Sequence, residues 1–284
     1  MRDKLDPLIA ERAPWLCSKS AIARVIKPAL DRILRYDRTV ALGKELELLT
    51  AQQIMSRMER EIAQRVTVSG RWNIPSAGAA LIVANHPTGI ADAIMLSKAI
   101  QPVRDDIFFY ANRDILRVLP QLGDMIAPVE WREERRSHSS LRETMDFTRR
   151  AVTDGRLGII FPSGRLAKRT GVSLAERPWM ASAAMIARKF RLPVIPIHLR
   201  ARNSNLFYAL DVIHHTLRDV TLFHETLNKD RQPYHISVGE PISPSALPAR
   251  SDEAITLLKT TVEKLGKGAA TVAEHWSARA IALR

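Results

Sequence analysis

From Val66 onward, the chain alternates short apolar segments with longer amphipathic stretches, and this alternation limits its possible folds more than any other feature. Each apolar segment has the length of one buried strand, and each amphipathic stretch has the period of a helix. Strands that alternate with helices build a largely parallel sheet with the helices on its faces. We therefore expect an α/β domain with a central mixed, largely parallel sheet flanked by helices. The predicted strands are 66–69, 80–84, 107–110, 158–161, 194–198 and 235–238, and the helices between them are 91–100, 139–152 and 180–190.

Residues 1–64 are interpreted as a helical segment that precedes the α/β domain, residues 65–284. Between Ser20 and Gln64, apolar side chains recur with a nearly helical period, which predicts two amphipathic helices. Their apolar faces either pack on the domain, the commoner arrangement, or rest on a bilayer with basic side chains toward the headgroups. Those basic residues are Lys19, Arg24, Lys27, Arg32 and Arg35. Residues 251–282 are expected to be helical and to pack on the domain.

The charge of the chain favours an anionic partner, because 43 Lys and Arg stand against 30 Asp and Glu, a formal net charge of +13. Nucleic acid, an anionic membrane surface and an acidic protein all fit this charge. Nucleic acid is disfavoured, since the chain has neither zinc-finger spacing nor an RNP-type aromatic motif. No apolar window approaches the roughly 18 to 20 residues of a membrane-spanning helix. The first residues also lack a signal-peptide pattern, so we expect a cytoplasmic protein, peripherally associated with the inner face of the membrane.

A histidine and an aspartate follow the predicted strand 80–84, in the segment Asn85-His86-Pro87-Thr88-Gly89-Ile90-Ala91-Asp92. The carboxyl edge of the strands is where open α/β sheets usually carry their chemistry. A carboxylate beside one ring nitrogen selects the histidine tautomer and makes the imidazole a better proton acceptor. We predict that His86, oriented by Asp92, is a general base. The simpler alternative is a structural histidine at the end of a strand.

Three later segments also carry motifs at strand ends. The strand 107–110 leads to Arg113, the strand 158–161 leads to Pro162-Ser163-Gly164-Arg165, and the strand 194–198 is bracketed by prolines. Together with Asn85-His86, and in this order, these segments resemble the four motifs of the glycerolipid and lysophospholipid acyltransferase (PlsC-like) family. The resemblance covers residues 66–242. It implies transfer of a fatty acyl group from a thioester to a lipid hydroxyl.

The resemblance also implies roles for the matching residues. His86 and Asp92 match the family's catalytic histidine and its partner acid. The second and third motifs are linked in the family with holding the anionic headgroup of the acceptor. A planar guanidinium suits this role because it binds phosphate or carboxylate through two parallel hydrogen bonds. The implied substrate-binding residues are Asn85, Arg113, Phe161, Pro162, Ser163, Gly164 and Arg165.

Two departures from the family pattern point to one of its branches. Five residues separate His86 from Asp92, one more than is usual, and Gly89 in that loop can absorb the addition. Ser163 stands where the third motif usually has a glutamate that is associated with a glycerol phosphate acceptor. Both departures are similar to those of haemolysin-like and aminolipid-type acyltransferases, as are residues 202–208, 223–229 and 238–242. The resemblance therefore implies a lyso-aminolipid of the ornithine-lipid type, or a lysophospholipid, as acceptor.

The expected reaction is a direct transfer from acyl carrier protein or coenzyme A, with no further cofactor. Cys17 lies far from the motifs, and the chain has no Gly-x-Ser-x-Gly elbow, so no acyl-enzyme is expected. No metal site is expected either, because the adjacent His214 and His215 would diverge on a helix. The mixed-charge run 131–136 is a solvated surface or a docking surface for an acidic carrier protein. A basic nucleic-acid-binding protein and a non-catalytic membrane-binding scaffold are the alternative functions.

Overall fold

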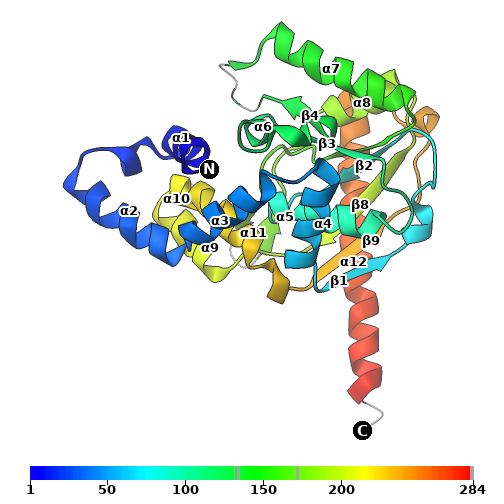
Figure 1. Ribbon diagram of the computed structural model, residues 1–284. Helices are drawn as coiled ribbons and strands as arrows, with labels where there is room; N and C mark the ends of the chain where they lie inside the picture. The colour runs from blue at the N-terminus through cyan, green and yellow to red at the C-terminus, as the bar shows by residue number, and fades with distance from the viewer. Residues whose placement is uncertain (131, 133–134, 171–172, 282–284) are drawn as a thin grey trace.

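A central sheet organises the computed structural model, which describes residues 1–130, 132, 135–170 and 173–281. Its strands are β1 (Val66–Ser69), β2 (Ala80–Ala84), β3 (Ile107–Asn112), β4 (Ile126–Val129), β5 (Leu157–Ile160), β8 (Val194–Arg200) and β9 (Tyr234–Val238). Among the described residues the strand order is β1-β9-β8-β2-β5-β3-β4 (Figure 1). The strands from β8 to β4 are parallel, whereas β9 is antiparallel to β8 and β1 follows the direction of β9. The predicted mixed, largely parallel sheet is confirmed.

Helices cover both faces of this sheet. On one face, Ile82 of β2 belongs to an apolar core with α1, α3, α4 and α5, and on the other Leu81 and Val83 pack with α7, α8 and α12. Every residue of β2 is buried, which explains its continuous apolar sequence. These helices are α1 (Arg2–Arg12), α3 (Tyr36–Leu46), α4 (Ala51–Ile62), α5 (Ile90–Ile100), α7 (His138–Thr153), α8 (Ser182–Lys189) and α12 (Ser251–Ile281).

The N-terminal segment has more helices than the predicted two. Between Ser20 and Gln64 it forms α2 (Ala21–Ile33), α3 and α4, because the chain breaks twice. Arg35 adopts a left-handed conformation between α2 and α3, and Thr50 caps α4 through a reciprocal side-chain bond with Gln53. Helices α1, α3 and α4 contribute to the core of the sheet, which is the commoner arrangement considered above. The domain division at residue 64 stays a prediction.

A small lobe lies beside the sheet at the left of Figure 1. It consists of α2, the short helix η1 (Pro14–Cys17) and the helices α9 (Asn205–Ile213) and α10 (His215–Val220). Leu16, Leu30, Leu210 and Leu217 form its separate apolar core. No helix in the described part of the chain is long and apolar enough to span a bilayer.

Several elements were not predicted from the sequence, among them α9, α10, an edge strand and a hairpin. β4 is an edge strand with Pro128 inside it, and a proline within an apolar run argues against a strand although an edge tolerates it. The hairpin of β6 (Lys168–Thr170) and β7 (Ser173–Ala175) lies in the connection after β5.

The close approach of β5 to β3 generates a stability prediction. A Cβ atom at Gly158 would lie 2.7 Å from Cζ of Phe108, a fully buried ring. We expect Gly158→Ala to lower the free energy of unfolding by about 1–3 kcal/mol through overpacking. Gly123→Ala is the matched control, because a Cβ there has no neighbour within 4 Å. Urea unfolding compares the two, and equal effects would contradict the packing argument.

Candidate active site

The predicted site residues lie at the carboxyl edge of the parallel strands. β2 is followed by Asn85 and His86, its neighbour β5 by Phe161, and the next strand, β3, by Arg113. Because β2, β5 and β3 are adjacent and parallel, their carboxyl ends meet at one edge of the sheet. The fold thus gathers three segments that are far apart in the sequence.

His86 and Asp92 are in contact despite the longer loop between them. Nδ1 of His86 lies 2.9 Å from Oδ2 of Asp92, although the ring N–H is not aimed along that line, so the contact is primarily electrostatic. The Asp92 side chain is fully buried, and that of His86 is 19% exposed. Gly89 permits the loop, since its φ of 96° is unfavourable for other residues.

Asp92 is held in place by groups other than His86. It lies in the first turn of α5, where Oδ2 accepts the backbone N–H groups of Thr88 and Gly89, each at 2.9 Å. Oδ1 accepts the hydroxyl of Thr88 at 2.6 Å. Unpaired N–H groups and the helix dipole both favour a carboxylate there. The negative charge beside His86 is therefore fixed by the start of the helix.

Tyr234 supports the same loop from β9. Its hydroxyl lies 2.5 Å from Oγ1 of Thr88. Burial first, and then the negative charge of Asp92, raise the pKa of Tyr234 well above its usual value, so the phenol keeps its proton. The loop is thus connected to two strands, β2 and β9.

Phe161 lies against the imidazole of His86. The ring centroids are 4.2 Å apart, with an angle of 24° between the planes. An offset aromatic stack of this kind restricts rotation of the histidine ring. Phe161 therefore has a place in orienting His86, and its predicted substrate contact stays a prediction.

The remaining third-motif residues form the turn after β5. The carbonyl of Pro162 accepts the N–H of Met180 at 2.9 Å, and Ser163 is buried and donates its hydroxyl to the carbonyl of Arg165 at 2.8 Å. Gly164 has a positive φ of 58°. Arg165 is exposed and has no ion pair with any described residue. The turn thus presents one arginine to solvent.

The side chain of Asn85 bonds to the backbone of a neighbouring strand. Its side-chain amide donates to the carbonyl of Leu199 at 2.9 Å and accepts the N–H of the same residue at 2.6 Å. This pair of bonds extends the ladder between β2 and β8 up to the position before His86. The geometry supports a structural role for Asn85, and its predicted substrate contact stays a prediction.

Arg113 lines a cavity of about 610 Å³ in which both signs of charge meet. Its guanidinium pairs with Glu143 of α7. Arg132 is almost buried, with Oε2 of Glu11 at 2.5 Å and Oδ2 of Asp114 at 3.0 Å. Arg132 and Arg135 belong to the run 131–136, whose residues 131, 133 and 134 lie outside the described part. The charged residues of the cavity are Glu11, Arg113, Asp114, Arg117, Glu130, Arg132, Arg135 and Glu143.

Glu176 is a site residue that the sequence analysis missed. Its Oε1 accepts the backbone N–H of His86 at 3.0 Å, and its Oε2 accepts the indole N–H of Trp179 at 3.1 Å. Burial raises the pKa of Glu176, while the bond from His86 opposes this effect. The N–H of Ala167 donates to the carbonyl of His86, so both backbone groups of His86 bind the loop after β5. Glu176 lies in no motif, and no local signal identifies it.

A second buried network joins two of the segments that resemble the aminolipid branch. Nζ of Lys229, which has no exposed surface, lies 2.8 Å from Oδ1 of Asn203 and 3.3 Å from Oε2 of Glu225. Glu225 also accepts the N–H of Ser204 at 2.8 Å. Burial lowers the pKa of Lys229, and Glu225 opposes this effect. These residues tie α9 to α11 (Leu222–Leu227), so Glu225 has a structural role.

Comparisons with known proteins show what this chain is similar to. A family model described as Acyltransferase matches residues 65–200. Lyso-glycine lipid O-acyltransferase of Phocaeicola vulgatus is 22% identical over 227 residues, 78% of this chain and 80% of that protein. These matches support a member of the glycerolipid acyltransferase family. The family predicted from the four motifs is confirmed, and this acyltransferase is an enzyme of lipid synthesis.

Two further similarities extend this result. The acyltransferase is 24% identical over 211 residues to lyso-glycine lipid O-acyltransferase of Bacteroides thetaiotaomicron, covering 72% of this chain and 73% of the relative. The crystal structure of the 1-acyl-sn-glycerophosphate (LPA) acyltransferase PlsC from Thermotoga maritima superposes with a TM-score of 0.50 at 17% identity. That match covers 95% of this chain and 98% of the other. At this identity the match shows a shared fold.

The contact of Glu176 with the His86 backbone predicts a positioning role. We expect Glu176→Ala to lower kcat of the acyltransferase about 10- to 100-fold, because small displacements of a reacting group are costly. Glu176→Gln keeps an acceptor for the His86 N–H and should lose less. Steady-state kinetics and thermal melting are measured on both. If Glu176→Ala has a lower melting temperature but an unchanged kcat, the residue only stabilises the loop.

Proposed function

We propose that this acyltransferase moves a fatty acyl group from an acyl thioester to the hydroxyl of a lyso-lipid, with His86 as general base. The observation that carries the proposal is the contact between His86 Nδ1 and the anchored carboxylate of Asp92. A carboxylate at Nδ1 leaves Nε2 to accept a proton and stabilises the imidazolium that forms. The general class of reaction follows from membership in the family.

The proposed reaction is a direct transfer. His86 takes the proton of the acceptor hydroxyl while that oxygen attacks the thioester carbonyl. The tetrahedral intermediate then expels the thiolate, which takes up the proton from the imidazolium, so the enzyme returns to its initial state. Cys17 lies in η1, outside the edge described above, and has no part in this scheme. Acyl carrier protein and coenzyme A are both suitable donors, and the scheme needs no cofactor.

For the acceptor we favour a lyso-aminolipid over a lysophospholipid. The two relatives named lyso-glycine lipid O-acyltransferases support this choice. The cavity beside Arg113 adds a physical reason, because a headgroup with a carboxylate and an ammonium group needs both arginine and glutamate. Arg113 and Glu143 provide such a pair, and Arg165 is a further cation without an ion pair among the described residues. A phosphate headgroup would use the arginines alone.

Peripheral contact with the inner face of an anionic membrane completes the proposal. The lobe that contains α2 exposes apolar side chains, with Ile22 66% and Val25 72% accessible. Lys19 and Arg24 are exposed beside them. An amphipathic helix with this composition fits the boundary between headgroups and acyl chains. The scaffold alternative uses the same surface without chemistry, and the next experiment separates the two.

His86→Ala tests the general base. We expect kcat to fall roughly 10²- to 10⁴-fold, the usual contribution of a positioned base. His138→Ala, at an exposed position on α7, is the control and should keep full activity. Acyl transfer to a lyso-lipid in detergent micelles is measured together with thermal stability. A fully active His86→Ala variant would refute the mechanism, and a wild-type protein without transfer activity would favour the scaffold.

Glu143→Gln tests the class of acceptor. If Glu143 binds a headgroup ammonium, loss of the Glu143 charge should raise KM for a lyso-aminolipid about two- to fivefold. This factor corresponds to the free energy of one exposed ion pair. The same variant frees Arg113 and should lower KM for lysophosphatidate. Glu253→Gln, far along the chain on α12, is the control. A KM that changes in the same direction for both acceptors would contradict the aminolipid assignment.

A further inference from the structure

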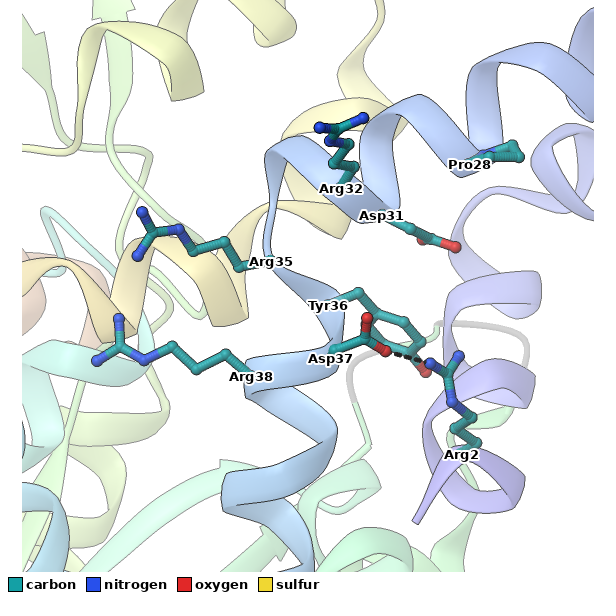
Figure 2. Close-up of a pocket in the computed structure, with 8 residues that line it drawn as sticks. All are labelled: Arg2, Pro28, Asp31, Arg32, Arg35, Tyr36, Asp37 and Arg38. Carbon is teal, nitrogen blue, oxygen red and sulfur yellow. Dashed lines mark hydrogen bonds and ion pairs between the residues drawn. The ribbon is translucent and has the colours of Figure 1, made fainter.

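The junction of α2 and α3 encloses a second cavity, of about 520 Å³ (Figure 2). Its charged lining consists of four arginines, Arg2, Arg32, Arg35 and Arg38, and two aspartates, Asp31 and Asp37. The excess of cations gives this cavity a positive character, unlike the mixed cavity beside Arg113. It lies where the lobe meets α1 and α3, in a segment that the acyltransferase family model does not cover.

Several of these charges already have partners. Arg2 pairs with Asp37 at 2.5 Å, and Arg38 pairs with Glu61 at 2.7 Å. Asp31 pairs with Lys27 at 2.7 Å. Arg32 and Arg35 are exposed and have no ion pair with any residue that the structure describes. Arg32 and Arg35 thus each present a guanidinium group that has no ion pair among the described residues and is available to an anion.

The backbone of Arg35 keeps these arginines at one corner. Its φ of 48° and ψ of 49° are left-handed, which is uncommon for a residue with a side chain and costs about 1 kcal/mol or more. This conformation ends α2 and starts α3 without a longer loop. In Figure 2, Asp37 meets Arg2 on one side of the junction, whereas Arg32, Arg35 and Arg38 extend away from that pair.

An exposed apolar stripe leads to the same corner. Ile22, Val25, Ala29 and Ile33 are spaced three or four residues apart along α2, so they share one helix face, and all four are exposed. Ile33 is 54% accessible and directly follows Arg32. Apolar side chains that enter the acyl boundary of a bilayer would bring the neighbouring arginines to the level of the phosphate groups.

We propose that Arg32 and Arg35 form a binding site for the phosphate of an anionic phospholipid headgroup. The proposal rests on the peripheral membrane contact described above. It makes that contact specific, because in a diffuse electrostatic attraction every basic residue of the lobe would contribute equally to membrane binding. A guanidinium pairs with phosphate through two parallel hydrogen bonds, which an ammonium group cannot do. An acidic protein or a nucleic acid would need an extended basic surface without the apolar stripe.

The test compares two double variants of the full chain. Arg32→Gln with Arg35→Gln removes two charges from the site, and Lys19→Gln with Arg24→Gln removes two charges from the same lobe outside it. Sedimentation with phosphatidylcholine vesicles, with and without phosphatidylglycerol, measures binding. Diffuse attraction predicts an equal loss of about 30-fold for each double variant, whereas the site predicts a loss at least several times larger for the Arg32 and Arg35 pair.

Controls separate the possible sources of the anion. Binding of inorganic phosphate without vesicles, followed by calorimetry, should be weak and abolished in the Arg32 and Arg35 variant. Phosphate binding without any dependence of vesicle binding on phosphatidylglycerol would overturn the lipid assignment, as would equal losses in the two double variants. The assays contain no acyl donor, so their outcome is independent of acyl transfer. A failure of the general-base mechanism would appear only in the kinetics of His86→Ala.

Discussion

The bond between the start of α5 and the carboxylate of Asp92 is the interaction on which the site depends. Two backbone N–H groups and the Thr88 hydroxyl hold this carboxylate at the end of β2. A buried charge is costly unless it is paired and hydrogen-bonded, and here the helix end provides both the bonds and a favourable dipole. Because the anchoring does not use His86, the negative charge is present before the histidine accepts a proton.

The other contacts of His86 orient it from several directions. Asn85 connects the preceding position to β8, Phe161 stacks on the ring, and Glu176 binds the backbone N–H. Phe161 and Glu176 both lie in the connection after β5, so a displacement of this connection would change the position of the histidine as well. The site is therefore supported by the sheet and by one long connection.

Charge is distributed unevenly over the acyltransferase. Beside Arg113 the cations meet carboxylates, and Arg132 is almost buried among them. At the junction of α2 and α3, Arg32 and Arg35 have no such partners among the described residues. The formal net charge of +13 therefore does not indicate which charges are available at either of these two cavities. Ion pairing at each place decides which arginines are available to an anionic ligand.

Local sequence patterns determined six of the seven strands of the sheet, its main helices and the positions of His86 and Asp92. Apolar runs such as 80–84 specify buried strands wherever they occur, and the residues that directly follow them must lie at the carboxyl edge. The His86 segment and the third motif were therefore predictable. β4 was missed because Pro128 interrupts its pattern, and the helices of residues 1–64 were undercounted because Arg35 has no turn signal.

Only the tertiary structure decided which partners these residues have. Glu176 meets His86, Asn85 meets Leu199 and Lys229 meets Asn203 across long separations in sequence, and no periodicity encodes such pairs. The pairing of Arg113 with Glu143, and the lack of an ion pair for Arg32 and Arg35 among the described residues, likewise follow from how the helices pack. The sequence determines which side of each element is buried, because burial follows local patterns. Contacts between distant side chains depend on the relative positions of whole elements, which only the folded chain defines.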